Sequence, residues 1–201
     1  KAQFIDELMQ MGSTKKQAEN EVFTSIDRLI YYAGWADKYQ QINSSVNPVS
    51  GPYFNFTVQE PTGVVAVIAP EENGLIGLVS TIAPIIVSGN SCIVLASESK
   101  ALCSVSFAEV VNSSDVPGGV INILTGNAEE LIPHFSTHKD VNSMLYCGND
   151  KKATQLIKEN STTNLKRIVV KKDIDWMKNE NESPYFITKF TEVKTTWHPI
   201  E

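Results

Sequence analysis

The stretch that decides the fold runs from Glu60 to Pro70 and reads Glu-Pro-Thr-Gly-Val-Val-Ala-Val-Ile-Ala-Pro. Its β-branched run after Gly63 has no polar alternation, which is typical of a strand that other elements cover on both faces. A second such run follows in Ser88-Gly-Asn-Ser-Cys-Ile-Val-Leu-Ala96, and the apolar residues between the two runs predict a helix. Strand, helix and strand in this order predict the first unit of a parallel sheet.

The alternation of strand and helix continues to about Lys172. Continuous apolar runs predict buried strands at 64–68, 92–95, 120–124, 144–147 and 167–170. Helical patterns lie between these runs, at about 75–87, 101–112, 128–135 and 151–160. Such alternation is the signature of a doubly wound sheet with right-handed crossovers. We therefore predict an α/β fold built on a doubly wound parallel sheet of about five strands.

The N-terminal region, from Ala2 to about Gln41, has apolar residues at every third or fourth position and predicts helices. Gly12 is placed to end a first helix, and Ser13 or Thr14 is placed to cap a second. Two N-terminal helices are therefore expected to pack against the sheet.

Two segments, 53–59 and 190–197, alternate apolar and polar residues and so predict antiparallel strands with an exposed face. A turn-rich stretch, 43–52, precedes the first of them. A polar stretch, 173–183, precedes the second and predicts a linker or a short irregular segment. Unpaired backbone groups are costly once buried. The last strand must therefore pair either with residues 53–59 or with another subunit.

Composition and charge exclude several classes of partner. The chain has 201 residues and a net charge of −6, whereas nucleic-acid binders need clustered Lys and Arg. No apolar run reaches the ~18 residues of a membrane helix. The three cysteines, Cys92, Cys103 and Cys147, have no metal-ligand spacing, and an odd number gives no complete disulfide framework. We expect no nucleic acid, no membrane, no metal, and a reducing, cytoplasmic location.

Eight motifs resemble, in this order, landmarks of the aldehyde dehydrogenase superfamily: Tyr31-Tyr-Ala-Gly-Trp-Ala-Asp-Lys38, Glu60 to Pro70, Ile82-Ala-Pro84, Ser88-Gly-Asn90, Pro117-Gly-Gly-Val-Ile-Asn122, Thr125-Gly126, Asn164-Leu-Lys-Arg167 and Thr191-Glu-Val-Lys-Thr195. The resemblance implies a Rossmann-like cofactor domain over residues 1–172, with an N-terminal helical segment and an inserted arm strand near 53–60. It implies that residues 173–201 are a linker and the C-terminal strand of a small β oligomerisation arm. The family's catalytic domain, which carries the nucleophilic cysteine, would fall between Arg167 and Phe190, where there are too few residues for it.

The resemblance also implies where the other reacting groups should lie, and they are replaced. The family's Pro-Trp-Asn-Phe-Pro segment aligns with Pro70-Glu-Glu-Asn-Gly74, so Glu72 stands where an amide stabilises the oxyanion, unless a one-residue shift brings Asn73 there. A carboxylate would repel the developing alkoxide, which reverses a contribution of about 3 kcal/mol. The run aligned with the general-base glutamate, Arg167 to Ile174, contains no glutamate. Cys147 lacks the nucleophile's sequence context, but its thiol follows a strand and could face a pocket. We therefore expect no catalytic residue.

Part of the family's cofactor site is retained. The Lys-Pro-Ser-Glu motif that holds the adenosine ribose aligns with Ala96-Ser-Glu-Ser99, so the lysine is absent while Glu98 keeps the ribose contact. The glycine-rich turn that receives the pyrophosphate at a helix N-terminus aligns with Gly148-Asn-Asp-Lys-Lys-Ala153, which keeps the first glycine only. The resemblance thus implies a weakened NAD or NADP site, whose cofactor-binding residues are Pro70, Glu98, Gly126, Gly148 and Asn149.

Two functional hypotheses of different classes follow. The first is a catalytically inactive aldehyde dehydrogenase-like module that binds or oligomerises, with itself or another chain, through its arm strands. It has a second version, in which residual dinucleotide binding makes the protein a nucleotide sensor. The alternative is a truncated or spliced form of an NAD(P)-dependent aldehyde dehydrogenase, an oxidoreductase that works only beside a full-length partner. The replaced motifs favour the first hypothesis, and the abrupt junction after Arg167 motivates the second.

Overall fold

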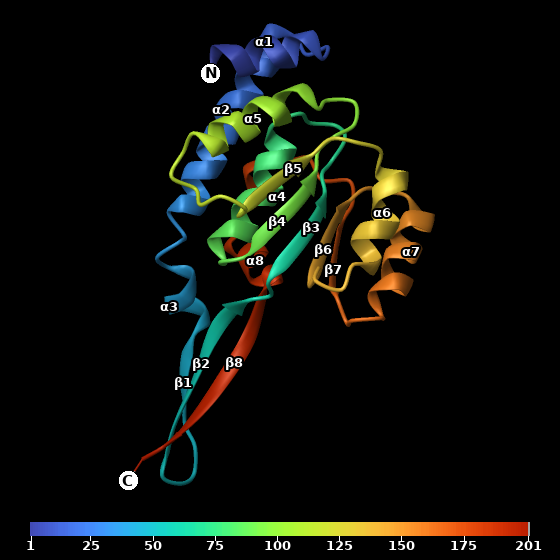
Figure 1. The fold of residues 1–201 in the computed structure, drawn as a ribbon. Helices are drawn as coiled ribbons and strands as arrows, with labels where there is room; N and C mark the ends of the chain where they lie inside the picture. Colours follow the sequence, from blue (N-terminus) through green and yellow to red (C-terminus); the bar gives the residue numbers. More distant parts are fainter. Residues whose placement is uncertain (201) are drawn as a thin grey trace.

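The computed structural model describes residues 1–200 and contains a five-stranded parallel sheet (Figure 1). The strands are β3 (Val64–Ile68), β4 (Ser91–Leu95), β5 (Ile121–Leu124), β6 (Ser143–Cys147) and β7 (Arg167–Lys171). Their order is β5-β4-β3-β6-β7, and all neighbours are parallel. The chain therefore runs outward from β3 to β5 and then returns to the other side of β3. The predicted α/β fold with a doubly wound sheet is confirmed, and the order reverses between β3 and β6.

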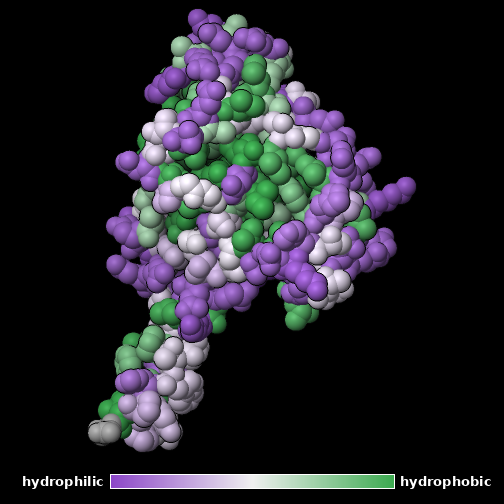
Figure 2. Space-filling view, in the orientation of Figure 1, coloured by the Kyte–Doolittle hydropathy of each residue, from purple (hydrophilic) through white to green (hydrophobic). Residues whose placement is uncertain are grey.

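Helices cover both faces of this sheet (Figure 1). They are α4 (Ile76–Val87) and α5 (Leu102–Asn112) on one face, and α6 (Ala128–Thr137) and α7 (Lys151–Ser161) on the other. Within β3, Val65 and Val67 belong to the first core and Ala66 and Ile68 to the second, which explains the continuous apolar run. Figure 2 shows apolar side chains that reach the surface between α5 and α6, over the β5 side of the sheet. Leu124, the last residue of β5, is exposed. Along residues 1–200, no helix combines the length and apolar character that crossing a membrane requires.

The N-terminal region forms three helices, α1 (Ala2–Gln10), α2 (Lys15–Ala33) and α3 (Tyr39–Asn43). Thr14 caps α2: its hydroxyl accepts from Gln17 N at 3.4 Å, and the Gln17 side chain accepts from Thr14 N at 2.9 Å. Gly12 turns the chain before this cap with φ +96°. The expectation of two helices was therefore incomplete. The short α3 forms where buried Tyr39 packs beside strand β2 (Tyr53–Pro61).

The arm is a three-stranded antiparallel sheet that projects from the body (Figures 1 and 2). Its strands are β1 (Ser45–Asn47), β2 (Tyr53–Pro61) and β8 (Thr191–Pro199), in the order β1-β2-β8. The last strand pairs within the chain, from Tyr53 opposite Pro199 to Pro61 opposite Thr191. The sequence did not predict β1, whose Asn47 amide donates to Asn55 Oδ1 at 2.6 Å on the neighbouring strand.

Residues 172–190 lead directly from β7 to the arm and pack against the body. They contain two short 3₁₀ turns, η1 (Asn179–Asn181) and η2 (Thr188–Phe190), and one short helix, α8 (Pro184–Ile187). Trp176, Phe186 and Phe190 of this segment are buried in the larger core. The polar sequence of the segment gave little sign of this packing.

A fully buried arginine on α2, Arg28, holds this segment in place. Its guanidinium donates to the Ser80 hydroxyl at 3.0 Å and to the carbonyls of Trp176 and Lys178, each at 3.2 Å. Its Nε lies 3.0 Å from a carboxylate oxygen of Glu182, an ion pair whose geometry is not that of a hydrogen bond. One side chain thus fixes α4 and the linking segment to α2.

Candidate functional site

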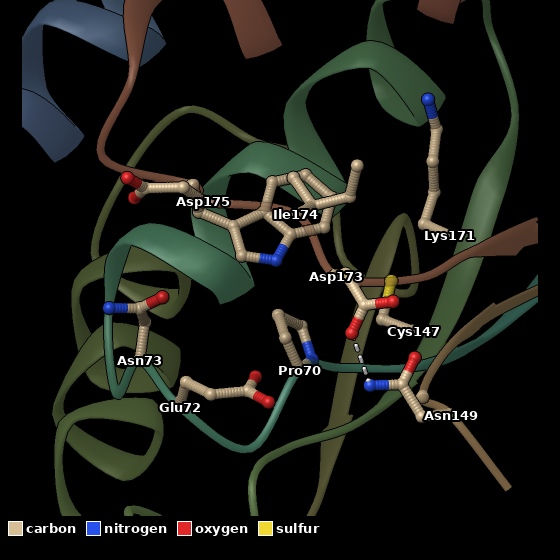
Figure 3. A pocket seen from close by; sticks show the side chains of 11 residues that line it. Pro70, Glu72, Asn73, Cys147, Asn149, Lys171, Asp173, Ile174 and Asp175 are labelled. Carbon is tan, nitrogen blue, oxygen red and sulfur yellow. Dashed lines mark hydrogen bonds between the residues drawn. The ribbon is translucent and has the colours of Figure 1, made fainter.

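A cavity of about 350 Å³ opens at the carboxyl end of the parallel strands, beside the point where the strand order reverses. Doubly wound sheets bind their ligands at such a position. The residues that line the cavity follow β3, β6 and β7: Pro70, Glu72, Asn73, Cys147, Gly148, Asn149, Lys171, Asp173, Ile174, Asp175 and Trp176 (Figure 3). The cavity therefore lies where the family resemblance implies part of a cofactor site.

Three of the five expected cofactor residues, Pro70, Gly148 and Asn149, line this cavity together. Glu98 and Gly126 do not line it, because they follow β4 and β5 on the other half of the sheet. The Glu98 carboxylate accepts from the Asn127 amide at 3.2 and 3.3 Å, and so it is engaged by the residue next to Gly126. The structure thus separates the expected residues into two groups.

The loop after β4 is organised around a carboxylate that the sequence did not single out, Glu71. This carboxylate accepts from the backbone N–H groups of Glu98 at 3.0 Å and Ser99 at 3.3 Å, and from the Ser97 hydroxyl at 2.9 Å. Burial acts to raise the pKa of Glu71, but these hydrogen bonds outweigh it and hold the pKa below its usual value. The donors of this loop are therefore occupied by an anion of the chain itself.

The N-terminus of α7 also has an internal anion. Asp150 caps the helix, and its carboxylate accepts from Lys152 N at 2.7 Å. A free helix N-terminus is favourable for phosphate, but a carboxylate at that end already uses a donor and repels a second anion. A Cβ atom on Gly148 would lie 2.6 Å from the Tyr146 hydroxyl oxygen, so any larger residue at this position requires the Tyr146 ring to move.

The charges around the cavity are mainly negative. Figure 3 shows the Glu72 carboxylate directed toward Pro70, and Asp173 accepting a hydrogen bond from Asn149 at 2.7 Å. Lys171 is the cation that lines the cavity, and its ammonium lies 4.8 Å from the centre of the Phe186 ring, away from these carboxylates. The cavity thus offers little to balance the charge of a pyrophosphate.

Cys147 lines the cavity, yet its surroundings do not favour a thiolate. Its side chain is buried, and burial raises the pKa of the Cys147 thiol; Lys171 opposes this, while Glu72 adds to it. Burial likewise raises the pKa of Cys92 and of Cys103 to about 12. Since the thiolate is the nucleophile, burial works against activation of each of these three thiols.

We expect Cys147 in the folded protein to react with iodoacetamide at pH 8 at least about tenfold more slowly than a free thiol, because each unit of pKa elevation lowers the thiolate fraction by this factor. Peptide mass spectrometry of samples quenched over time measures the rate. Urea-unfolded protein is the control, in which all three cysteines should react alike. A folded-state rate equal to the unfolded rate would contradict the expectation.

Across residues 1–200, no group of three or more His, Cys, Asp and Glu side chains is arranged to hold a metal ion.

Among the cavity residues, the Asn73 amide points away from Pro70, while Glu72 points toward it (Figure 3). Asn73 nevertheless lines the cavity, so this pair brings one carboxylate and one amide to its wall.

Comparison with known proteins gives matches along most of the chain. The family model described as "Aldehyde dehydrogenase family" matches residues 3–172. The chain is 30% identical to an Omega-crystallin of Enteroctopus dofleini, over 80% of this chain and 32% of the relative. It is 32% identical to human aldehyde dehydrogenase 1A1, over 75% of this chain and 30% of the relative. An aldehyde dehydrogenase structure from Bacillus cereus superposes with a TM-score of 0.77 at 22% identity, over 85% of this chain and 35% of that one. The matched region is about a third of the length of these relatives.

Proposed function

The chain belongs to the aldehyde dehydrogenase family, and from this premise we propose that it is a non-catalytic member that serves as a binding and oligomerisation module through its arm. The observation that carries the proposal is the direct connection of β7 to β8. Residues 172–190 occupy the place in the chain where the family resemblance expects the domain with the nucleophile, and they form only short helical turns. The family match ends at residue 172, where this connection begins.

The chemistry of the cavity supports the same proposal. Aldehyde oxidation needs a thiolate, a donor for the oxyanion, a base and a correctly held nicotinamide. Here burial disfavours the thiolate of Cys147, the one cysteine that lines the cavity, and Glu72 stands at the position that the family resemblance assigns to the donor. The residues present do not fit a dinucleotide well either, because Asp150 places a carboxylate at the helix end that would receive the pyrophosphate.

We expect the purified protein to show no NAD- or NADP-dependent oxidation of aldehydes above the enzyme-free blank. Dinucleotide reduction at 340 nm with short aliphatic and aromatic aldehydes measures it, and an active family member treated in parallel is the positive control. A turnover of ~1 s⁻¹ or more, in the range of ordinary enzymes, would overturn the proposal.

Dinucleotide sensing is the second candidate function, favoured by the shared cavity of Pro70, Gly148 and Asn149. We expect calorimetric titration with NAD or NADP to give no binding in the micromolar range. Asp150→Asn keeps a capping side chain and removes the charge at the α7 N-terminus, so it should strengthen any residual affinity. Micromolar binding by the unaltered protein would favour the sensor over the oligomerisation module.

Function beside a longer dehydrogenase chain is the remaining alternative, motivated by the junction after β7. Native mass spectrometry of the complex isolated from cells distinguishes this alternative from self-association, because a mixed complex contains a second, heavier chain.

We place the protein in the cytoplasm, since its three free cysteines are buried and unpaired by disulfides among the described residues.

A further inference from the structure

β8 is an edge strand of the arm, nine residues long, with nothing beside its outer side in residues 1–200 (Figure 1). Edge strands offer a row of unpaired N–H and C=O groups to any second strand. Two large side chains on this strand are also exposed, Val193 at 64% and Trp197 at 58%. The strand thus has both backbone and apolar groups available for a partner.

The hydrogen-bond register shows which residues of β8 face outward. Thr62 N donates to Phe190 O at 3.2 Å, and Ile200 N donates to Pro52 O at 2.9 Å, one bond at each end of the β2–β8 ladder. In an antiparallel pair, hydrogen-bonded and non-hydrogen-bonded positions alternate. The even-numbered residues of β8 therefore bond to β2, and the backbone groups of the odd-numbered residues point away from it.

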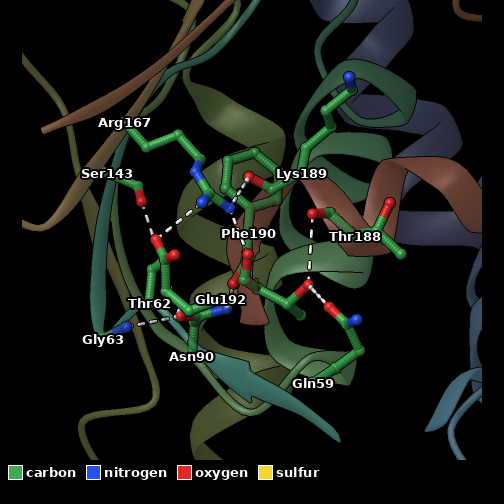
Figure 4. Close-up of polar contacts among 11 residues, drawn as sticks. Gln59, Thr62, Gly63, Asn90, Ser143, Arg167, Thr188, Lys189, Phe190 and Glu192 are labelled. Carbon is green, nitrogen blue, oxygen red and sulfur yellow. Dashed lines mark hydrogen bonds and ion pairs between the residues drawn. The ribbon is translucent and has the colours of Figure 1, made fainter. Parts of the chain in front are cut away.

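At each end of this outward row, one backbone group is unavailable. The Thr191 carbonyl accepts from the Arg167 guanidinium, which also binds Glu192 at 2.7 Å (Figure 4). At the other end, Pro199 has no N–H to donate. Between them, Val193, Thr195 and Trp197 keep their outward N–H and C=O groups, a set that is symmetric about Thr195.

We propose that β8 pairs antiparallel with β8 of a second copy of this chain, centred on Thr195 opposite the partner's Thr195. This deepens the oligomerisation function proposed above and rests on it. Val193 then forms a hydrogen-bonded pair with the partner's Trp197, and their two exposed side chains meet on one face. On the other face, Glu192 lies opposite the partner's His198. The two arms form one continuous six-stranded sheet.

Other symmetric registers are less favourable. Centring the pair on Lys194 places two ammonium groups opposite each other, which is destabilising. Centring it on Val193 requires the Thr191 carbonyl, which Arg167 already engages. Centring it on Thr196 places Val193 opposite Pro199, where a donor is missing, and Lys194 opposite His198. The register about Thr195 uses every free outward group and brings no like charges together.

Cysteine cross-linking tests this register directly. Thr195→Cys places two thiols on directly opposed residues, whose Cα atoms lie about 5.5 Å apart in a hydrogen-bonded pair, a distance that a disulfide spans. Thr196→Cys is the matched control, because the register sets the two copies of residue 196 too far apart to bridge. The native cysteines are buried and should not interfere. We expect mild oxidation to convert most of the Thr195→Cys protein, and only a background fraction of Thr196→Cys, to a covalent dimer on non-reducing gels. Equal cross-linking of the two variants would overturn the register.

Removal of a single outward N–H tests the pairing itself. Thr195→Pro loses this donor without removing a β2–β8 bond, and Thr195→Val is the control that loses the same hydroxyl, which lies 3.1 Å from Thr57 Oγ1, but keeps the N–H. We expect sedimentation equilibrium to show dimers for the unaltered protein and Thr195→Val, with association at least about tenfold weaker for Thr195→Pro. Circular dichroism confirms that both variants are folded.

The outcomes separate this inference from the proposed function. Dimers that persist in Thr195→Pro would show self-association through another surface, which overturns the β8 pairing and leaves the non-catalytic module intact. If the unaltered protein is monomeric at every concentration, the pairing of two β8 strands is also overturned. This is the result expected if β8 instead binds a strand of a different protein. Measurable aldehyde oxidation would instead contradict the proposed non-catalytic function, whatever the cross-linking shows.

Discussion

Arg28→Met is expected to lower the free energy of unfolding by about 3–5 kcal/mol, the usual cost of removing one partner of a buried ion pair. The guanidinium is fully buried, and its loss leaves the Trp176 and Lys178 carbonyls without this donor. The Glu182 carboxylate also loses the cation 3.0 Å away. Because these partners belong to the segment between β7 and β8, we expect that segment to be loosened first.

Urea unfolding followed by circular dichroism measures this change. Lys16→Met on the same helix is the control, since it makes a similar substitution at an exposed position and should change stability by less than about 0.5 kcal/mol. Adding Glu182→Gln to Arg28→Met should recover about 1 kcal/mol, because it removes the charge left unpaired. Hydrogen exchange should increase most in residues 174–190. A loss below about 1 kcal/mol would mean that Arg28 does not hold the segment.

The parallel sheet was predictable because its strands are covered on both faces. The runs in β3, β4 and β6 contain apolar residues at successive positions, and the structure places them alternately in two cores. No tertiary information is needed to recognise such a pattern. The helices between the strands follow from the same regularity, and so the order of elements could be derived from the sequence.

The elements that the sequence missed depend on distant partners. β1 has only three residues, Ser45–Asn47, and its extended conformation is stabilised by pairing with β2 and by amide contacts such as Asn47 to Asn55. The packing of residues 172–190 depends on Arg28, which lies far away in the sequence on α2. Local secondary-structure propensity does not predict either of these long-range contacts.

Some residues of the candidate site could likewise be predicted from the sequence, and others could not. Pro70 and Gly148 could be placed together because each follows the carboxyl end of a strand, and β3 and β6 are neighbours. Glu71 could not be found, because its role depends on the N–H groups of Glu98 and Ser99, in the loop after β4. The position of Glu98 beside Asn127 likewise reflects side-chain choice between two loops, and the strand pattern does not determine it.

Asn90→Leu is expected to lower the free energy of unfolding by about 2–4 kcal/mol and to loosen the base of the arm. The Asn90 amide is buried, with its oxygen accepting from Gly63 N at 2.8 Å and its nitrogen donating to Phe190 O at 2.8 Å (Figure 4). It also accepts from the Thr62 hydroxyl at 3.0 Å and donates to the Ser88 hydroxyl at 2.7 Å. Leucine fills a similar volume but leaves these groups unpaired, and each unpaired buried group costs about 1–3 kcal/mol.

The location of Asn90 gives this prediction a local signature. Thr62 follows β2 and Phe190 precedes β8, so one amide joins the two strands where the arm leaves the body. Asn112→Leu, at an exposed position at the end of α5, is the control and should be nearly neutral. Asn90→Asp keeps the two acceptor contacts but sets a carboxylate oxygen against the Phe190 carbonyl, so it should also destabilise the protein. Amides near the base of β2 and β8 should exchange faster in Asn90→Leu than those of β4, measured by mass spectrometry. Uniform acceleration across the chain would show that Asn90 stabilises the body alone, and that the arm is held to it by other contacts.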